Sequence, residues 1–309
     1  MKEIKVKTAQ MTDSEYESEL ESLNVQKYNS KLNCLNSHKG LRSAEISTII
    51  GPKGGGKSSF IRTIEIELLM QERRIYSFLS EELLKKYNLP IYKSFKTFLK
   101  EEDKVNYYLQ NLFVDSQLEL PKECLTIEWL IHRIEHMIEN HAVDCIIFDN
   151  FTTSFICSQL PFRSQAMAIH EFKRIAIKYD VPFLLVIHTA KGTDVYKDLI
   201  DGENVRGDAT SVNMGSYNYI ISAFFRCNPV RTFLSIDKAR YHGSANKTVF
   251  ELHYDKELGI FTKDERSNQL EIQRVINGFK KQSKKVSIKI DWESILRIIV
   301  RAKIQKNEC

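Results

Sequence analysis

The 309-residue sequence has no apolar run near the length of about 20 residues that a membrane-spanning helix needs. Its longest apolar stretches, such as 181–187, are far shorter, and the N-terminus MKEIKVKTAQ has no signal-peptide core. Internal repeats and low-complexity segments are also missing. We therefore expect a globular cytoplasmic protein without a membrane partner, or a nuclear one if the host has a nucleus.

Cysteine is sparse and scattered. The six thiols, at Cys34, Cys124, Cys145, Cys157, Cys227 and Cys309, show neither CxxC nor Cys/His ligand spacing. This pattern argues against a zinc site and against a disulfide framework. Cys145 lies inside an apolar segment and is expected to be a small buried thiol.

Positive charge is concentrated near the C-terminus. The whole chain carries a formal charge of +5, and residues 263–309 contain 12 Lys and Arg against 6 Asp and Glu, a net +6. The run Lys280–Lys285 could contact a phosphate backbone, and the alternative is a solvated basic linker. Residues 1–262 are close to neutral.

The most informative motif is a glycine-rich loop, GPKGGGKSS. It comprises Gly51, Pro52, Lys53, Gly54, Gly55, Gly56, Lys57, Ser58 and Ser59. Glycines let successive backbone N–H groups surround a β-phosphate, Lys57 reaches the β- and γ-oxygens, and Ser58 supplies a hydroxyl to Mg²⁺. An apolar strand precedes the loop and a helix follows it, so a nucleotide site for ATP or GTP with Mg²⁺ is predicted in preference to a chance glycine-rich turn.

Apolar strands alternate with amphipathic helices along the chain, which predicts an α/β fold with a mainly parallel sheet and helices on both faces. Residues 83–120 are interpreted as a charged insertion with helical and short apolar pieces. Strands are expected at 46–50, 74–80, 144–148, 182–187, 219–225 and 232–237, with a final hairpin at 248–261; helices are expected at 58–71, 126–140 and 165–179.

Three polar side chains follow three of these strands and should meet the glycine-rich loop at one edge of the sheet. Asp149 ends a strand 92 residues after Lys57 and is predicted to hold Mg²⁺ together with Ser58. Glu82, or its neighbour Glu81, can polarise an attacking water. His188 could report whether a γ-phosphate is present.

With these motifs in this order, residues 32–261 resemble the RecA-like core of hexameric replicative helicases of the DnaB and Twinkle type, including plasmid and phage relatives. The resemblance rests on GLRSAE at 40–45, the glycine-rich loop, FLSEE at 78–82, IIFDN at 146–150, LVIHTAK at 185–191, VRGDA at 205–209 and IDKARYHG at 236–243. The last two are the most specific of these segments.

The resemblance implies a RecA-like P-loop NTPase fold, ATP and Mg²⁺ as cofactors, and a homo-oligomer, expected to be a hexameric ring. It assigns Glu82 as the catalytic base, His188 as the sensor, and Lys238 with Arg240 as cations that reach a neighbouring subunit's γ-phosphate. It also implies a channel loop at 189–212 that grips single-stranded DNA, with Lys191 and Arg206 as candidate contacts, although acidic residues outnumber basic ones there.

We expect three regions: an N-terminal extension with a short helix at 1–31, an ATPase core at 32–263, and a basic, partly helical tail at 264–309 that could bind a replication partner. The expected activity is ATP-driven translocation on nucleic acid or its unwinding. Two alternatives stay open, namely a RecA- or KaiC-like recombination or regulatory ATPase, and a nucleotide-gated loader or scaffold with little turnover.

Overall fold

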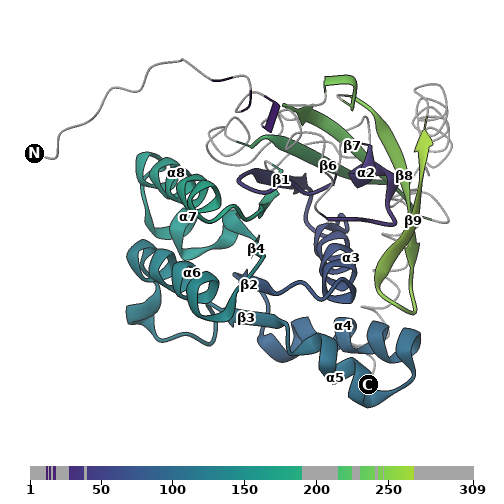
Figure 1. Cartoon of the computed structure of the whole chain (residues 1–309), viewed down its shortest axis with the longest axis horizontal. Helices are drawn as coiled ribbons and strands as arrows, with labels where there is room; N and C mark the ends of the chain where they lie inside the picture. Colours follow the sequence, from purple (N-terminus) through teal and green to yellow (C-terminus); the bar gives the residue numbers. More distant parts are fainter. Residues whose placement is uncertain are drawn as a thin grey trace, which may run out of the picture. The chain divides into compact units, whose positions relative to one another are not determined.

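The computed structural model describes residues 12, 14, 17–18, 28–37, 40–189, 215–224, 230–240, 243–245 and 247–267 (Figure 1). Contacts divide the chain into two units, Met1–Asn268 and Gln269–Cys309. Every described residue belongs to the first unit. Most of the predicted N-terminal helix and nearly all of the predicted basic tail lie outside the described residues.

The first unit is built on a nine-stranded mixed sheet with the strand order β3-β2-β4-β5-β1-β6-β7-β8-β9. The first six strands in this order are parallel, and the remaining three pair antiparallel. The predicted α/β class with a mainly parallel sheet is therefore confirmed. The strands are β1 (Ile46–Gly51), β2 (Ile75–Leu79), β3 (Leu112–Ser116), β4 (Cys145–Asp149), β5 (Phe183–His188), β6 (Tyr217–Phe224), β7 (Arg231–Ala239), β8 (Val249–Asp255) and β9 (Ile260–Ser267).

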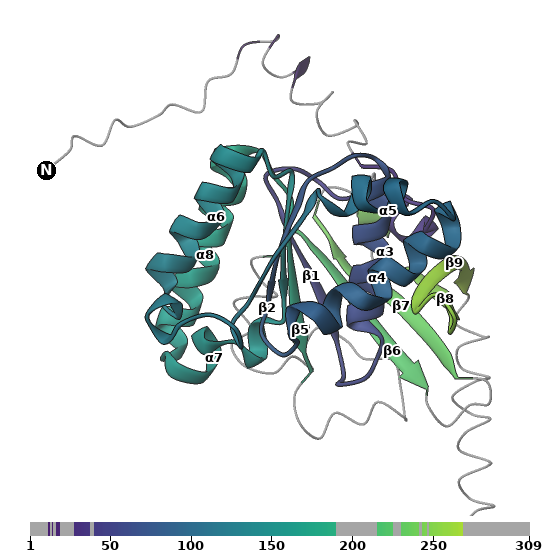
Figure 2. The same cartoon turned by 90° about the horizontal axis from the view of Figure 1, so that it is seen from below.

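Helices cover both faces of the sheet, as Figure 2 shows, with α3, α4 and α5 on one side and α6, α7 and α8 on the other. The chain moves along the sheet from β1 to β3 in one direction and returns to β5 in the other. Because crossovers between parallel strands are almost always right-handed, the helices of the two passes fall on opposite faces. The helices are α2 (Asn33–Asn36), α3 (Lys57–Met70), α4 (Leu84–Leu99), α5 (Glu102–Leu109), α6 (Ile127–His141), α7 (Phe155–Gln159) and α8 (Phe162–Tyr179), with short 3₁₀ turns η1 (Lys122–Cys124), η2 (Phe151–Thr153) and η4 (Gly243–Ala245).

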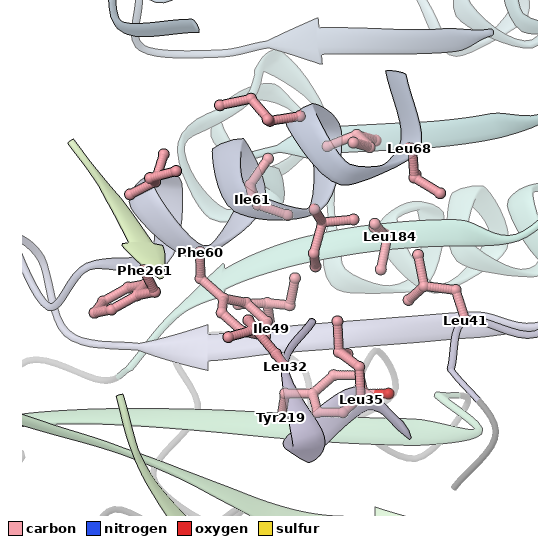
Figure 3. Close-up of a cluster of buried hydrophobic side chains, with 14 of the residues drawn as sticks. Leu32, Leu35, Leu41, Ile49, Phe60, Ile61, Leu68, Leu184, Tyr219 and Phe261 are labelled. Atoms are coloured by element: carbon pink, nitrogen blue, oxygen red, sulfur yellow. The ribbon is translucent and has the colours of Figure 1, made fainter. Parts of the chain in front are cut away.

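Alternation along the central strands divides the core into two clusters. Ile49 of β1 packs in the cluster under α3, whereas its neighbour Ile50 packs in the cluster under α6 and α8. Since successive side chains of a strand point to opposite faces, a strand buried on both faces reads as a continuous apolar run. Figure 3 shows Phe60, Ile61 and Leu68 of α3 within the first cluster.

The 83–120 segment contains more regular structure than the sequence predicts. It forms α4, α5 and the edge strand β3, which pairs with β2. This strand was missed because its residues are only half-buried apart from Ser116, and Asp115 interrupts the apolar pattern. The tyrosyl hydroxyl of Tyr76 donates to Asp115 at 2.9 Å, and Arg133 pairs with Asp115 at 2.7 Å.

The residues before β1 are hydrogen-bonded to the last strand and to the residue before β4. Asp264 of β9 accepts hydrogen bonds from the backbone N–H groups of Asn33 and Cys34 at the start of α2. The Tyr28 hydroxyl donates to the carbonyl oxygen of Asp144. Packing thus extends from Tyr28 to the end of β9, a few residues beyond each boundary expected for the core.

Candidate functional site

The candidate site lies where four parallel strands end. Gly51 at the end of β1 is in register with His188 at the end of β5, and Leu79 at the end of β2 is in register with Asp149 at the end of β4. The order β2-β4-β5-β1 makes these strands neighbours. The structure therefore brings the glycine-rich loop, the Glu81–Glu82 pair, Asp149 and His188 to one edge, as the sequence predicts.

The loop between β1 and α3 needs its glycines. Gly54 and Gly56 have φ values of +74° and +96°, in the left-handed region that side chains disfavour. At Gly55 a Cβ atom would approach Pro52 to 2.9 Å, and at Gly51 it would approach the Ile221 carbonyl oxygen to 2.8 Å. Larger residues would strain or displace the loop, so its shape depends on the motif.

The N-terminus of α3 opens into this loop. The capping residue Gly56 has no side chain that could bind the first N–H groups of the helix, and the first turn of α3 contains no acidic residue. The N–H groups at a helix N-terminus and the helix dipole together favour an anion. Lys53 adds an exposed positive charge to the same loop. The geometry fits a phosphate group.

Lys57 is buried, with a relative exposure of 5%. Its ammonium group donates to the carbonyl oxygens of Gly51 at 3.0 Å and Pro52 at 2.7 Å, and lies 3.0 Å from Nδ1 of His188. Burial lowers the pKa of Lys57 to about 8, against the opposing effect of Asp149 and Glu81. This lysine is held inside the loop by weak, neutral acceptors that a phosphate could replace.

Asp149 lies beside the start of α3. Burial raises its pKa to about 6, while a hydrogen bond from Ser58 and the charge of Lys57 lower it. A hydroxyl and a carboxylate next to this glycine-rich loop are ligands that would suit Mg²⁺ if phosphate oxygens and water completed the shell. Within the described part of the chain, no group of three or more His, Cys, Asp and Glu side chains could hold a metal by itself.

His188 is buried between two donors. Lys57 faces its Nδ1, and the side-chain amide nitrogen of Asn150 lies 3.0 Å from its Nε2. The Asn150 amide is oriented by its oxygen, which accepts the backbone N–H of Thr153. A neutral imidazole can accept from only one of the two donors. A carboxylate oxygen of Glu81 is 3.7 Å from Nε2.

The two adjacent glutamates have different surroundings. Glu82 pairs with Arg62 of α3 at 2.9 Å, whereas Glu81 lies near His188 and acts on the charge of Lys57. Both side chains are 42% exposed. The sequence predicts Glu82 as the base and keeps Glu81 as the alternative. In the structure the charge of Glu81 acts on Lys57, whereas the charge of Glu82 acts on Asp149.

Arg62 has no functional signal in the sequence, because nothing in its position within α3 marks it. Its guanidinium lies 5.7 Å from the ring centroid of Tyr87 in α4. The Tyr87 hydroxyl donates to the fully buried Glu65, which also accepts from Ser77 of β2. Burial raises the pKa of Glu65 to about 7. This network connects α3, α4 and β2 behind the Glu81–Glu82 pair.

Lys238 and Arg240 lie near the opposite edge of the sheet. The backbone N–H of Arg240 donates to the carbonyl oxygen of Ser216, whose own N–H donates to Ile46 at the start of β1. The five residue steps from Ile46 to Gly51 cover about 17 Å at the usual rise of a strand. Arg240 is exposed and Lys238 is half-buried. Arg240 is therefore remote from the glycine-rich loop of its own chain.

Lys191 and Arg206, the predicted nucleic-acid contacts, lie outside the described residues. Among the helices that the structure does describe, none is long and apolar enough to cross a membrane. Neither a scan against protein-family models nor a search of curated proteins finds a significant match for this chain.

Proposed function

We propose that the protein is an ATP-hydrolysing, ring-forming motor with a RecA-like P-loop core, which translocates on or unwinds single-stranded nucleic acid, with DNA as the expected strand. One observation carries the proposal. The glycine-rich loop with Lys57 lies at the C-terminal end of β1, and the exposed Arg240 lies near the N-terminal end of the same strand. Each copy therefore presents two complementary halves of a site on opposite sides of the molecule. Head-to-tail contacts between such halves close into a ring.

Binding of the triphosphate is assigned to the loop. The N–H groups at the start of α3 surround the phosphates, and Lys57 exchanges the carbonyls of Gly51 and Pro52 for phosphate oxygens. Ser58 and Asp149 would hold Mg²⁺, which when bound neutralises charge on the phosphate oxygens. When Lys57 turns to the phosphates, Nδ1 of His188 loses its contact with the lysine. The imidazole can then form a different hydrogen bond, and this change of partner is the basis of the sensor role.

The contacts favour Glu81 over Glu82 as the general base. Glu81 lies on the side of Lys57 and His188, where the terminal phosphate and its attacking water would be. Glu82 is tied to Arg62 and is better suited to holding the loop after β2 in place. Hydrolysis by an isolated subunit should be slow, because Arg240 can act only on a neighbouring copy.

The proposal is tested by ATP hydrolysis with and without single-stranded DNA, alongside the oligomeric mass with and without ATP. We expect strong stimulation by DNA, a six-fold assembly in ATP, and loss of both nucleotide binding and turnover in Lys57→Ala. Turnover indifferent to any nucleic acid would reject the motor and favour a nucleotide-gated loader or scaffold. Filament growth on DNA, or phosphorylation without unwinding, would favour the recombination or regulatory ATPase.

A further inference from the structure

A buried carboxylate lies at the start of β1, at the sheet edge opposite the glycine-rich loop. Glu45 is 8% exposed, and one of its oxygens accepts hydrogen bonds from Lys173 of α8 and from the Ser216 hydroxyl. Lys173 also donates to the carbonyl oxygen of Ala44 at 2.8 Å. Moving a charged group out of water costs free energy, so a buried carboxylate needs hydrogen-bond donors or a cation to compensate it. Lys173 and Ser216 supply this compensation for Glu45.

Ser216 connects this carboxylate to Arg240. Its N–H donates to the Ile46 carbonyl at 2.8 Å, its carbonyl oxygen accepts the Arg240 N–H at 2.9 Å, and its hydroxyl donates to Glu45. One residue thus joins the first residues of β1, the buried carboxylate and the backbone of the exposed arginine. The backbone of Arg240 cannot shift without disturbing the hydrogen bonds of Ser216.

Glu45 also acts on Lys238. Burial lowers the pKa of Lys238 and the nearby charge of Arg240 lowers it further, whereas Asp237 and Glu45 oppose both effects. Lys238 near the end of β7 and Arg240 just beyond it are two cations two residues apart that repel each other, and the negative charge of Glu45 opposes the effect of this repulsion on Lys238. Glu45 is therefore linked to the Arg240 backbone by hydrogen bonds through Ser216, and it acts on Lys238 by its charge.

We propose that Glu45 is a positioning residue for Lys238 and Arg240, aiming this pair at the nucleotide of the adjacent subunit. The inference rests on the proposed function. It adds Glu45 to the half of the site that would act on the neighbouring subunit's nucleotide, a role that no sequence motif assigns to this residue. β1 also ends in Gly51, so the strand that anchors the cations in one interface carries the glycine-rich loop of the next.

The first experiment compares Glu45→Gln with a matched control, Asp115→Asn. Asp115 is likewise a shielded carboxylate in an ion pair, with Arg133, but it lies on the edge strand β3. We expect Glu45→Gln to lower the kcat of DNA-stimulated hydrolysis by on the order of 10- to 100-fold, with unchanged KM and ATP affinity. Asp115→Asn should leave kcat within about twofold, because its site does not touch the cation pair. Equal losses in both variants would overturn the positioning role.

The second experiment mixes subunits. Glu45→Gln subunits keep an intact glycine-rich loop, and Lys57→Ala subunits keep a correctly positioned Lys238 and Arg240. In a mixed assembly an interface is complete where the loop of the first variant meets the two cations of the second. At equal mixing such interfaces amount to about a quarter of all interfaces, being one half times one half. Activity should therefore rise above that of either variant alone. Mixing Arg240→Ala with Lys57→Ala gives the reference.

The outcomes separate the two claims. If the reference pair regains activity and the Glu45→Gln pair does not, the inference is wrong and the proposed function stands. If neither pair regains activity, the trans-acting site itself is wrong, and the inference falls with it. Should Glu45→Gln fail to fold, Ser216→Ala can replace it, because it removes one donor to the same carboxylate. It should give a smaller loss of kcat and the same recovery of activity on mixing with Lys57→Ala. Absence of both effects would overturn the inference.

Discussion

The ammonium group of Lys57 lies 3.0 Å from Nδ1 of His188, so the loop lysine is bound to its own chain rather than directed into solvent. Its other partners are the carbonyl oxygens of Gly51 and Pro52. None of these groups carries a full negative charge, which is why burial dominates and the pKa of Lys57 falls to about 8.

Triphosphate binding should therefore take up protons in mildly alkaline solution. In the free protein the neutral form of Lys57 is populated above pH 8, whereas phosphate oxygens would raise its pKa again. Affinity should be highest below about pH 8 and should fall as the pH rises further. Calorimetry at pH 8.5 in buffers of different ionisation enthalpy measures the uptake.

Lys57→Arg provides the control for this titration, because a guanidinium stays charged throughout the range and should abolish the uptake. Asp149, whose pKa is about 6, is already ionised at pH 8.5 and should not contribute. Binding by the wild-type protein without any proton uptake at pH 8.5 would contradict the role assigned to Lys57.

Substitution of the two neighbouring glutamates should give unequal results. Glu81→Gln removes the proposed base and should lower kcat by about 10²- to 10⁴-fold while ATP affinity is retained. Glu82→Gln removes the charge from the contact with Arg62 and a charge that acts on Asp149, and it should lower kcat by less than about tenfold. Single-turnover hydrolysis together with equilibrium binding of ATP measures both effects. The reverse order would return the base to Glu82.

Glu65 should make stability depend on pH. Burial raises its pKa from 4.5 to about 7, so between these values the folded state binds more protons than the unfolded state. Its contribution is fully present below about pH 4.5 and is lost as the pH rises through 7, a change of about 3 kcal/mol. Glu65→Gln cannot ionise, so relative to wild type it should gain stability between pH 5 and pH 8.

Urea unfolding at the two pH values measures this difference. Glu102→Gln, at an exposed position in the first turn of α5, is the control and should show no comparable change. A free-energy difference between Glu65→Gln and wild type that is the same at pH 5 and pH 8 would show that Glu65 does not titrate in this range.

Short sequence patterns predicted much of the fold and the position of the glycine-rich loop with the polar residues around it. Apolar runs such as 145–148 and 183–187 identified central strands buried on both faces, and the parallel order then placed their ends together. The edge strand β3 was missed because half-burial and Asp115 weaken its pattern.

The supporting contacts could not be predicted in this way. Arg62 and Glu82 meet only because α3 packs against the end of β2, and Ser216 binds Glu45 from 171 positions away in the chain. Such pairs have no characteristic spacing. The sequence named the groups proposed to touch phosphate, but the residues that hold those groups depend on tertiary packing.

The central claim is that nucleotide is hydrolysed between two copies of the chain, and mixing Lys57→Ala with Arg240→Ala tests it most directly. Each variant alone should be inactive, the first for lack of a loop lysine and the second for lack of the guanidinium. Together they should regain DNA-stimulated ATP hydrolysis, up to about a quarter of the wild-type rate if interfaces act independently. A mixture that stays at the background of its two components would contradict the account.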